Sequence, residues 1–142
     1  MSKPQFAPAI AQKSDAASIC LRRLGVKDLQ SVEKHLLGLA PSDRRSRFMG
    51  EVSDVVIVDY VRGLDPSDAV LIGAFDAGAR LIGLAEAHRT NRSEIVEVSV
   101  SVDLTHRRQG VGRSLVMRLL AQLFDTGTAA AEFLFSRYEY GL

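Results

Sequence analysis

Apolar and polar positions follow two different periods along the chain, and the first part of the chain has the period of helices. The run "SICLRRLG", closed by Gly25, is compatible with an initial strand. From Val26 onward, apolar residues recur at the spacing of one helical face until Pro41 interrupts the pattern. A strand followed by a helix is therefore predicted at the start of the folded part.

Two further short helices are predicted between Pro41 and Pro66. Ser42 is placed to cap the first, through "DRRSRF", and Ser53 to cap the second, through "DVVIVDYVRGL". The valine and isoleucine content of the second segment also suits a strand. Its serine cap, the aspartate in its first turn and the Asp65-Pro66 stop favour a helix.

The middle of the chain changes to the period of strands. The β-prone runs "AVLIGAFD", "ARLIGLAEAHR" and "SEIVEVSVSVD" are separated by short turns, which predicts an antiparallel meander of three strands. Side chains alternate between two faces along a strand, so the last run has one core face and one largely polar face. The core face holds Val96, Val98, Val100 and Val102, and the other holds Ile95, Glu97, Ser99 and Ser101.

An amphipathic helix and a last strand complete the predicted elements. Apolar residues at helical spacing predict a helix that ends before Gly127; they are Val111, Leu115, Leu119 and Leu123. The run "AAAEFLF" then predicts a final strand. Because the chain has no internal repeat or low-complexity linker, we expect a flexible leader over residues 1–17 and a single domain over residues 18–142.

Composition narrows the class of protein. The 142 residues are 46% hydrophobic and 25% charged, which is ordinary for a soluble globular protein. A formal net charge of +1 argues against a nucleic-acid binder that works by broad phosphate neutralisation. Cys20 is the only cysteine, so we expect no intrachain disulfide, no thiolate zinc cage or other metal site, and a reducing, cytoplasmic location. No segment approaches the roughly 20 apolar residues of a membrane span, so no membrane partner is expected.

The stretch "THRRQGVGRSL" places arginines and glycines at the turn between the last meander strand and the following helix. Such a turn exposes the first N–H groups of the helix, and glycine lets a ligand approach the backbone closely. Arg107, Arg108 and Arg113 would add charge-assisted contacts to a phosphate, while Gly110 and Gly112 remove Cβ atoms that would block it. The turn is neither a Walker loop nor the three-glycine dinucleotide motif. The alternative is that the glycines serve tight packing of helix on strand.

The segment "RRQGVG" resembles the Arg/Gln-x-x-Gly-x-Gly/Ala signature of the GNAT superfamily of acyl-CoA-dependent N-acetyltransferases, with Arg107, Gly110 and Gly112 in the defining positions. The resemblance covers about Leu21 to Phe135. It implies an α/β (α+β) fold, with a mixed, mainly antiparallel sheet and helices on both faces. The segments "SDRRSRF", "VSD" and "SVSVD" are similar to bacterial members that resemble the acetyltransferase domain of protein lysine acetylases.

The resemblance also implies where acetyl-CoA and an amine acceptor bind. The pyrophosphate would rest on N–H groups of the loop, and the pantetheine would pair with the backbone of the preceding strand. The implied cofactor-binding residues are Val100, Ser101, Val102, Arg107, Arg108, Gln109, Gly110, Val111, Gly112, Arg113 and Ser114. Glu97 has the position of the strand-four glutamate that often serves as base, and would deprotonate the amine through a water. Its alternative role is a solvated residue on the outer face of the strand.

Three other residues that can carry chemistry are expected to be structural. Cys20 is expected in the core rather than as a nucleophile, because direct acyl transfer needs none. His35 lies among the apolar positions of the first helix, which predicts a place in the core or at its boundary. His106 is expected to pack beside the loop rather than act as a base.

The end of the chain departs from the family pattern. After "AAAEFLF" the family continues with another helix and two further strands, for which no room remains before Leu142. An uncovered sheet edge invites pairing with another chain, so we expect a homodimer with Phe133, Phe135, Tyr138 and Tyr140 at its interface. Cover by the leader is the alternative.

Three function classes follow from these patterns. The first is an N-acetyltransferase that moves an acetyl group from acetyl-CoA to a primary amine, on a small molecule or a protein lysine. The second is a catalytically weak acyl-CoA-binding or regulatory remnant of the same fold. The third, a nucleic-acid binder that uses "RRQGVGRSLVMR" as a basic helix start, is disfavoured by the near-neutral charge.

Overall fold

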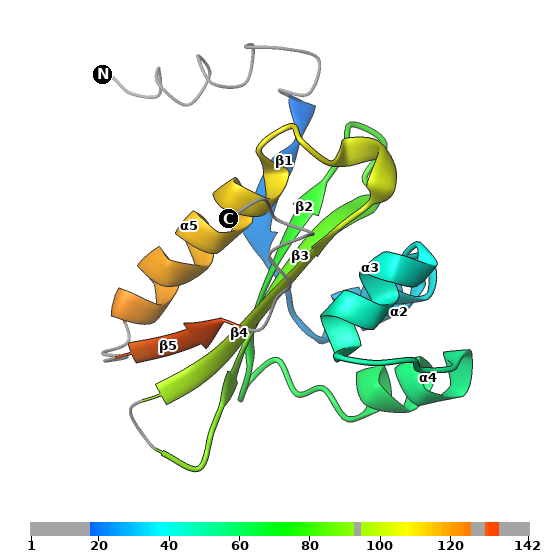
Figure 1. Ribbon diagram of the computed structural model, residues 1–142. Helices are drawn as coiled ribbons and strands as arrows, with labels where there is room; N and C mark the ends of the chain where they lie inside the picture. The colour runs from blue at the N-terminus through cyan, green and yellow to red at the C-terminus, as the bar shows by residue number, and fades with distance from the viewer. Residues whose placement is uncertain (1–17, 93–94, 126–129, 134–142) are drawn as a thin grey trace, which may run out of the picture.

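The computed structural model describes residues 18–92 and 95–125, and the backbone of residues 130–133. In chain order the elements are β1 (Cys20–Arg23), the 3-10 turn η2 (Val26–Asp28), α2 (Leu29–Leu37), α3 (Pro41–Phe48), α4 (Asp54–Arg62), β2 (Val70–Phe75), β3 (Leu81–Arg89), β4 (Ile95–Val102), the 3-10 turn η3 (Leu104–His106), α5 (Val111–Asp125) and β5 (Ala130–Phe133) (Figure 1). The predicted leader at residues 1–17 and the segment 134–142 lie outside the described residues.

The strands form one sheet in sequential order, β1-β2-β3-β4-β5. The first four strands are antiparallel to their neighbours, and β5 is parallel to β4. The predicted meander is therefore confirmed as β2, β3 and β4, and the predicted mixed, mainly antiparallel sheet is confirmed with it. Figure 1 shows α5 on one face of this sheet and α2, α3 and α4 on the other, as expected.

The α5 face of the sheet is built from small and β-branched residues. The apolar stripe of α5 packs against alternating strand residues; the stripe consists of Val111, Leu115, Leu119 and Leu123. Gly83 lies directly beneath the helix, because a Cβ there would stand 2.9 Å from a methyl group of Leu115. This close approach holds the N-terminus of α5 against the end of β4.

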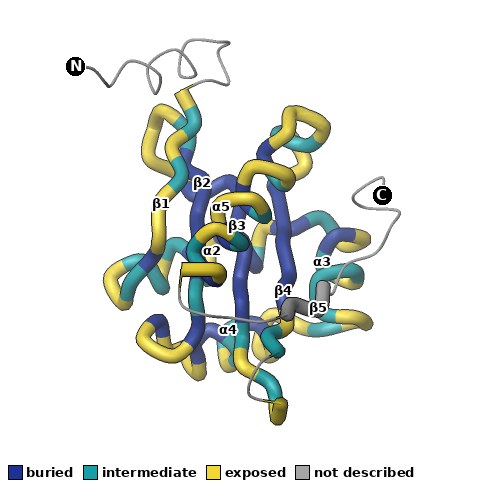
Figure 2. Tube along the Cα trace, turned by 90° about the vertical axis from the view of Figure 1, so that its left-hand side faces the viewer, coloured by how far each residue is buried: buried dark blue, intermediate teal, exposed yellow. Residues whose placement is uncertain are grey.

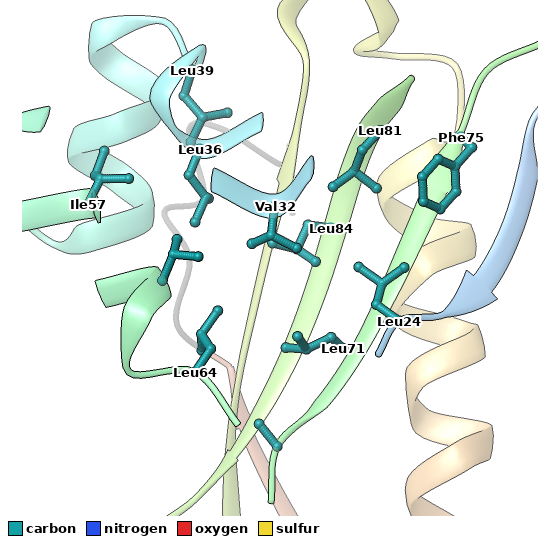
Figure 3. Close-up of a cluster of buried hydrophobic side chains, with 12 residues drawn as sticks. Leu24, Val32, Leu36, Leu39, Ile57, Leu64, Leu71, Phe75, Leu81 and Leu84 are labelled. Carbon is teal, nitrogen blue, oxygen red and sulfur yellow. The ribbon is translucent and has the colours of Figure 1, made fainter. Parts of the chain in front are cut away.

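The opposite face is a second apolar core. Side chains from α2 and α4 meet side chains from β2 and β3, and Figure 3 shows Val32 of α2 packed beside Leu84 of β3. The central strands are buried on both sides, as the dark tubes of β2, β3 and β4 show in Figure 2. These two cores make the sheet a rigid base for the polar groups described below.

Two local predictions were wrong. The helix α3 starts at Pro41 with Ala40 as its N-cap, so Ser42 lies inside the helix rather than at its cap. Proline suits this first position because its φ is already helical and its missing N–H is not needed there. Cys20 is exposed rather than in the core, because β1 is an edge strand of the sheet.

Two other predictions on the early helices and on β4 are sharpened by the structure. The helical prediction for "DVVIVDYVRGL" is confirmed, and Ser53 Oγ accepts a hydrogen bond from the N–H of Val56. The serine-bearing face of β4 is not solvated at its C-terminal half, since Ser99 and Ser101 are both buried. Over the described ranges of the chain, no helix combines the length and the apolarity that a membrane crossing requires.

Candidate active site

The loop between β4 and α5 is largely exposed and begins directly after the last residue of β4. After Asp103, whose N–H donates to the carbonyl of Ile82, η3 leads into an exposed turn at residues 108–110. The N–H of Ser114 donates to the carbonyl of Gly110, so the N–H groups of residues 111–113 precede this helical hydrogen bond. These are the donors that an α-helix leaves for a capping group or an anion.

The backbone of this loop is curved by two residues in the left-handed region. Arg108 has a φ of 64° and Gly110 a φ of 81°. An arginine rarely adopts this conformation, whereas glycine adopts it without steric cost. Alternation of left- and right-handed residues turns successive N–H groups toward one point, which forms an anion-binding concavity.

Gly112 is not explained by tight packing of the helix on the strand. A Cβ at this position would lie 3.6 Å from a methyl group of Val102, which is an ordinary van der Waals contact. The fold therefore leaves room for a larger side chain here. Packing within the fold therefore does not require a glycine at position 112. Close approach of a ligand to the backbone would require one.

The arginines of the loop have different surroundings. Arg107 Nη1 donates to Asp43 Oδ1 of α3 at 2.8 Å, so this side chain ties the loop to the helical layer. Arg108 and Arg113 are exposed, and neither forms an ion pair with another described residue. His106 is partly buried with Nδ1 3.2 Å from Thr105 Oγ1, which fits the expected place beside the loop.

The strand β4 supplies the remaining predicted residues. The ladder between β4 and β5 runs, within the described residues, from the pair Ile95–Ala130 to the pair Val98–Phe133. The segment Val100–Val102 lies beyond these pairs, with buried side chains, and leads directly into the loop. The predicted pantetheine contact and the predicted pyrophosphate contact are thus parts of one continuous stretch of backbone.

Glu97 is exposed at the other end of β4. It lies opposite His88 of β3 and opposite Glu132 of β5 in the sheet register. It forms no hydrogen bond or ion pair with any side chain of the described residues. Glu97, Ser99 and Ser101 share one face of β4, as predicted, and the structure shows that this face lies toward α3. The carboxylate therefore lies on the side of the sheet that carries the short helices.

Four polar residues from three elements meet on the same face, and we call them the Glu86 cluster: Arg47, Tyr60, Glu86 and His88. Arg47 Nη2 donates to Glu86 Oε2 at 2.5 Å and to Tyr60 Oη at 2.9 Å. Tyr60 Oη donates to Glu86 Oε1 at 2.5 Å. His88 Nε2 lies 3.0 Å from that same Oε1 and 3.1 Å from Tyr60 Oη.

Burial and charge set the protonation states of this cluster. Burial alone would raise the pKa of Glu86, but the Arg47 charge and the hydrogen bonds from His88 and Tyr60 outweigh it and lower the pKa to about 2. Burial, reinforced by the Glu86 carboxylate, raises the pKa of Tyr60 above its ordinary value. At neutral pH the cluster therefore holds an ionised carboxylate, a guanidinium and a neutral phenol.

The other end of the same face is held by a histidine. His35 Nε2 and Ser101 Oγ are 2.9 Å apart, and His35 Nδ1 lies 3.3 Å from Asp103 Oδ1. Burial opposes ionisation of Asp103, but His35 and Arg80 outweigh it and lower the pKa of this carboxyl. A pocket of about 340 Å³ opens beside these residues, between α2 and the β2–β3 turn. His35 is thus a core residue, as expected, and it fixes the end of β4.

Sequence reasoning missed the Glu86 cluster altogether. Its members lie 39 positions apart between Arg47 and Glu86, and no motif joins them. One signal was present: Glu86 and His88 stand at alternate positions inside the otherwise apolar run "LIGLAEAH", so one face of a buried strand carries two polar groups. Among the described residues, no group of three or more histidine, cysteine or acidic side chains is arranged to hold a metal ion.

Comparisons with known proteins agree with this architecture. A model of the acetyltransferase (GNAT) family matches residues 35–137. A search of the curated proteins gave no match. Among solved structures, an aminoglycoside acetyltransferase, meta-AAC0020, from an uncultured soil metagenomic sample aligns with a TM-score of 0.67 at 13% identity, over 90% of this chain and 84% of that one.

Two further solved structures have similar folds. The GNAT family N-acetyltransferase YhbS from Escherichia coli, solved in complex with CoA, has a TM-score of 0.64 and 23% identity over 87% of this chain. The GNAT domain of S. lividans PAT has a TM-score of 0.61 and 19% identity over 75% of this chain. The chain spans 66% of the length of each of these two proteins.

The family match covers more than half of the chain, and the fold around it has the expected strand order and helices. The predictions of fold class and of an N-acetyltransferase are confirmed at the level of the family. The chain belongs to the acetyltransferase (GNAT) family.

Proposed function

We propose that the protein transfers an acetyl group from acetyl-CoA to a primary amine by direct attack of the amine on the thioester. The observation that carries this proposal is the loop before α5, where curved backbone, unsatisfied helix N–H groups and exposed arginines meet at the end of β4. An arrangement of this kind suits a pyrophosphate, because helix N-termini and backbone concavities bind anions.

The loop and the adjoining part of β4 form the proposed CoA site. Backbone N–H groups from Arg108 to Arg113 face the pyrophosphate, and the side chains of Arg108 and Arg113 add positive charge. The pantetheine lies along Val100–Val102. Arg107 contributes backbone, while its side chain holds the loop on Asp43. Support comes from the space at Gly112, and one structural neighbour, YhbS, was solved in complex with CoA.

Glu97 is the proposed residue for acceptor deprotonation. An alkyl amine is mostly protonated at neutral pH and must lose a proton before its lone pair can attack. Glu97 is exposed on the face of β4 that the helices α2, α3 and α4 cover. Its carboxylate oxygens can therefore accept hydrogen bonds from a water or an ammonium group. The alternative is that Glu97 is a solvated carboxylate with no catalytic role, in which case its substitution should not change the rate of acetyl transfer.

The proposed acceptor is a primary amine of a small molecule or a protein lysine. One neighbour acetylates aminoglycosides, which are amine substrates, and another is the GNAT domain of PAT. The proposed location is the cytoplasm, because the one cysteine is a free thiol on an exposed strand. Neither a nucleic acid nor a membrane is a proposed partner.

Binding and turnover of the full chain test this function. Calorimetry with acetyl-CoA should show saturable binding, and an amine panel should yield free CoA thiol only in the presence of both substrates. A chain that binds acetyl-CoA but acetylates no amine would support the catalytically weak, acyl-CoA-binding alternative. Absence of binding would overturn both.

We also retain the homodimer as a proposal. In the described part of the chain, β5 is the outer strand beside β4, and edge strands invite pairing. Of the four aromatic residues expected at the interface, Phe133 lies at the end of β5, and Phe135, Tyr138 and Tyr140 lie outside the described residues. Light scattering of the full chain should give twice the monomer mass, and a chain ending at Phe135 should give the monomer mass. A full chain that stays monomeric at high micromolar concentration would exclude a stable dimer.

A further inference from the structure

His88 has the position and the hydrogen bonds of a proton acceptor. Its side chain is 32% exposed, whereas that of Glu86 is fully buried, so the imidazole stands where the cluster meets solvent. The imidazole is held on one nitrogen only, since Nε2 contacts Glu86 Oε1 and Tyr60 Oη. Nδ1 is left with no hydrogen bond among the described residues.

The charge state of Glu86 fixes which nitrogen of His88 carries hydrogen. An ionised carboxylate can only accept hydrogen bonds, and Glu86 is ionised beside Arg47. His88 Nε2 must therefore donate to Glu86, which leaves a lone pair on Nδ1 of the neutral imidazole. The same logic orients the histidine of hydrolase triads, where a buried carboxylate fixes the tautomer of the base.

The sheet register places His88 beside Glu97, the residue proposed to deprotonate the acceptor. His88 of β3 lies directly opposite Glu97 of β4, and Glu86 lies opposite Ser99. Directly opposed residues of an antiparallel pair point to the same face with Cβ atoms about 4.5–5.5 Å apart. We therefore invoke a bridging water between this imidazole and this carboxylate.

We propose that His88 Nδ1 is the final acceptor of the proton that the amine gives up, with Glu86 as its positioning residue. This inference rests on the proposed acetyl transfer. A water held by Glu97 takes a proton from the ammonium group and gives a proton to Nδ1, so the imidazole becomes cationic and the amine neutral.

The remaining steps balance without another reactant. The amine nitrogen forms a bond to the thioester carbon, and the C–S bond then breaks. The departing CoA thiolate takes the second proton from nitrogen and leaves as the thiol. His88 returns the first proton to solvent, so one proton is released for each amide formed.

The groups that face His88 are mostly acidic or neutral. Glu86 on β3 and Glu97 on β4 are both acidic, and Tyr60 from α4 is neutral. Arg47 from α3 is the one positive side chain of the cluster, and it is paired with Glu86. The imidazolium that forms during the reaction is therefore stabilised by a buried carboxylate at 3.0 Å.

The first test is a pH profile of acetyl transfer with H88Q, E97Q and the double variant. H88Q should lower kcat at neutral pH by roughly 10²-fold with acetyl-CoA affinity unchanged, and the deficit should shrink as pH rises. Because both residues act on one proton path, the double variant should lose little more than either single variant. H106Q, which removes the other partly exposed histidine, should keep the wild-type pH profile.

The second test separates positioning from structure. E86Q should lower kcat at neutral pH with acetyl-CoA affinity retained, because the carboxylate that holds the imidazole through Nε2 becomes an amide. Imidazole ¹⁵N spectra of the wild type should show His88 as the Nε2–H tautomer at neutral pH, a readout that needs no turnover. A spectrum of the Nδ1–H tautomer would overturn the proposal.

The outcomes distinguish this inference from the function on which it rests. Wild-type rates in folded H88Q at all pH values would overturn the His88 assignment alone. If the fold-losses in kcat of H88Q and E97Q multiply in the double variant, the two residues act independently, and the His88 assignment is overturned. A wild-type chain that acetylates no amine would overturn the proposed function and this inference together.

Discussion

The loop before α5 and the Glu86 cluster both flank β4, but they are built in opposite ways. The loop is exposed and continuous in sequence, with curved backbone and two arginines that pair with no other described residue. The cluster is buried, comes from α3, α4 and β3, and its central charges are paired at 2.5 Å. The loop can therefore change without loss of the fold, whereas the cluster supports the fold and the chemistry at once.

The largest effect should come from breaking the buried ion pair. R47M would leave the fully buried Glu86 carboxylate without its counter-charge, and its side chain keeps similar length. Removal of one partner of a buried pair costs about 3–5 kcal/mol. Urea denaturation should show this loss in the free energy of unfolding.

The chain offers a matched control on the same helix. Arg45 pairs with Glu51 at 3.3 Å, but the two side chains are 50% and 82% exposed. R45M should change the free energy of unfolding by about 0.5 kcal/mol or less, because exposed pairs contribute little. Equal effects of R45M and R47M would contradict the structural role of the cluster.

Acid should remove the contribution of Glu86 to stability. The pKa of Glu86 is lowered from 4.5 to about 2 in the folded protein, so the native state binds this proton less readily than the unfolded state. Its contribution is present above pH 4.5 and is lost as the pH falls toward 2. The free energy of unfolding, measured from pH 6 to pH 2, should fall in this window.

A comparison of two variants tests whether Glu86 causes this pH dependence of the free energy of unfolding. E86Q cannot titrate, so its stability should depend less steeply on pH in the same window. D28N removes a carboxyl whose pKa is also lowered, chiefly by Arg22, in a half-exposed ion pair, and it should flatten the curve less. An E86Q curve as steep as that of the wild type would show that Glu86 is not the group that titrates.

The third effect lies between the two regions, at Glu97. E97Q keeps the shape of the side chain but loses its base, so the acetyl transfer rate at neutral pH should fall roughly 10²-fold. Acetyl-CoA affinity and the free energy of unfolding should be retained, since Glu97 is exposed and pairs with no described side chain. Steady-state kinetics from pH 6 to pH 10 should show the deficit shrink as more amine is already neutral.

E51Q is the control for this measurement. Glu51 is 82% exposed, and among the described residues it pairs only with Arg45. It lies far in sequence from β4. Its removal should leave the rate unchanged. A wild-type rate in E97Q across the whole pH range would return Glu97 to the role of a solvated surface carboxylate.

The two regions also differ in how far the sequence predicts them. Strand and helix periods predicted every strand and α-helix of the described fold but neither 3-10 turn, and "RRQGVG" marked the loop, because those signals are local. The cluster depends on the sheet register and on how α3 and α4 pack over β3. A single sequence does not show such pairings, so nothing in it distinguishes Arg47 from the neighbouring arginines of "DRRSRF".

The same physics explains the smaller errors. Ser42 was predicted as a cap from its residue type, but Pro41 is better suited to the first helical position and moved the helix start. Cys20 was predicted in the core from its hydrophobicity, but an edge strand exposes it. The role of Ser42 depends on the residue before it, and the exposure of Cys20 depends on the place of β1 in the sheet.

The smallest effect, and the most specific, is expected at Gly112 in the loop. G112D adds a side chain and a negative charge where the pyrophosphate is proposed to lie, so CoA should bind at least tenfold more weakly, about 1.4 kcal/mol. The fold should not suffer, because a Cβ at this position makes an ordinary 3.6 Å contact with Val102. An aspartate in the first turn of a helix even stabilises it, by about 0.3–1 kcal/mol.

G112D therefore makes affinity and stability change in opposite directions, which no variant of the buried cluster should do. G112N is the matched control, since it has nearly the same volume without the charge and should lose less affinity. Calorimetry with CoA and urea denaturation of the same samples would measure both quantities. Unchanged CoA affinity in folded G112D would remove the loop from the proposed site, and a large loss of stability would show that Gly112 serves packing after all.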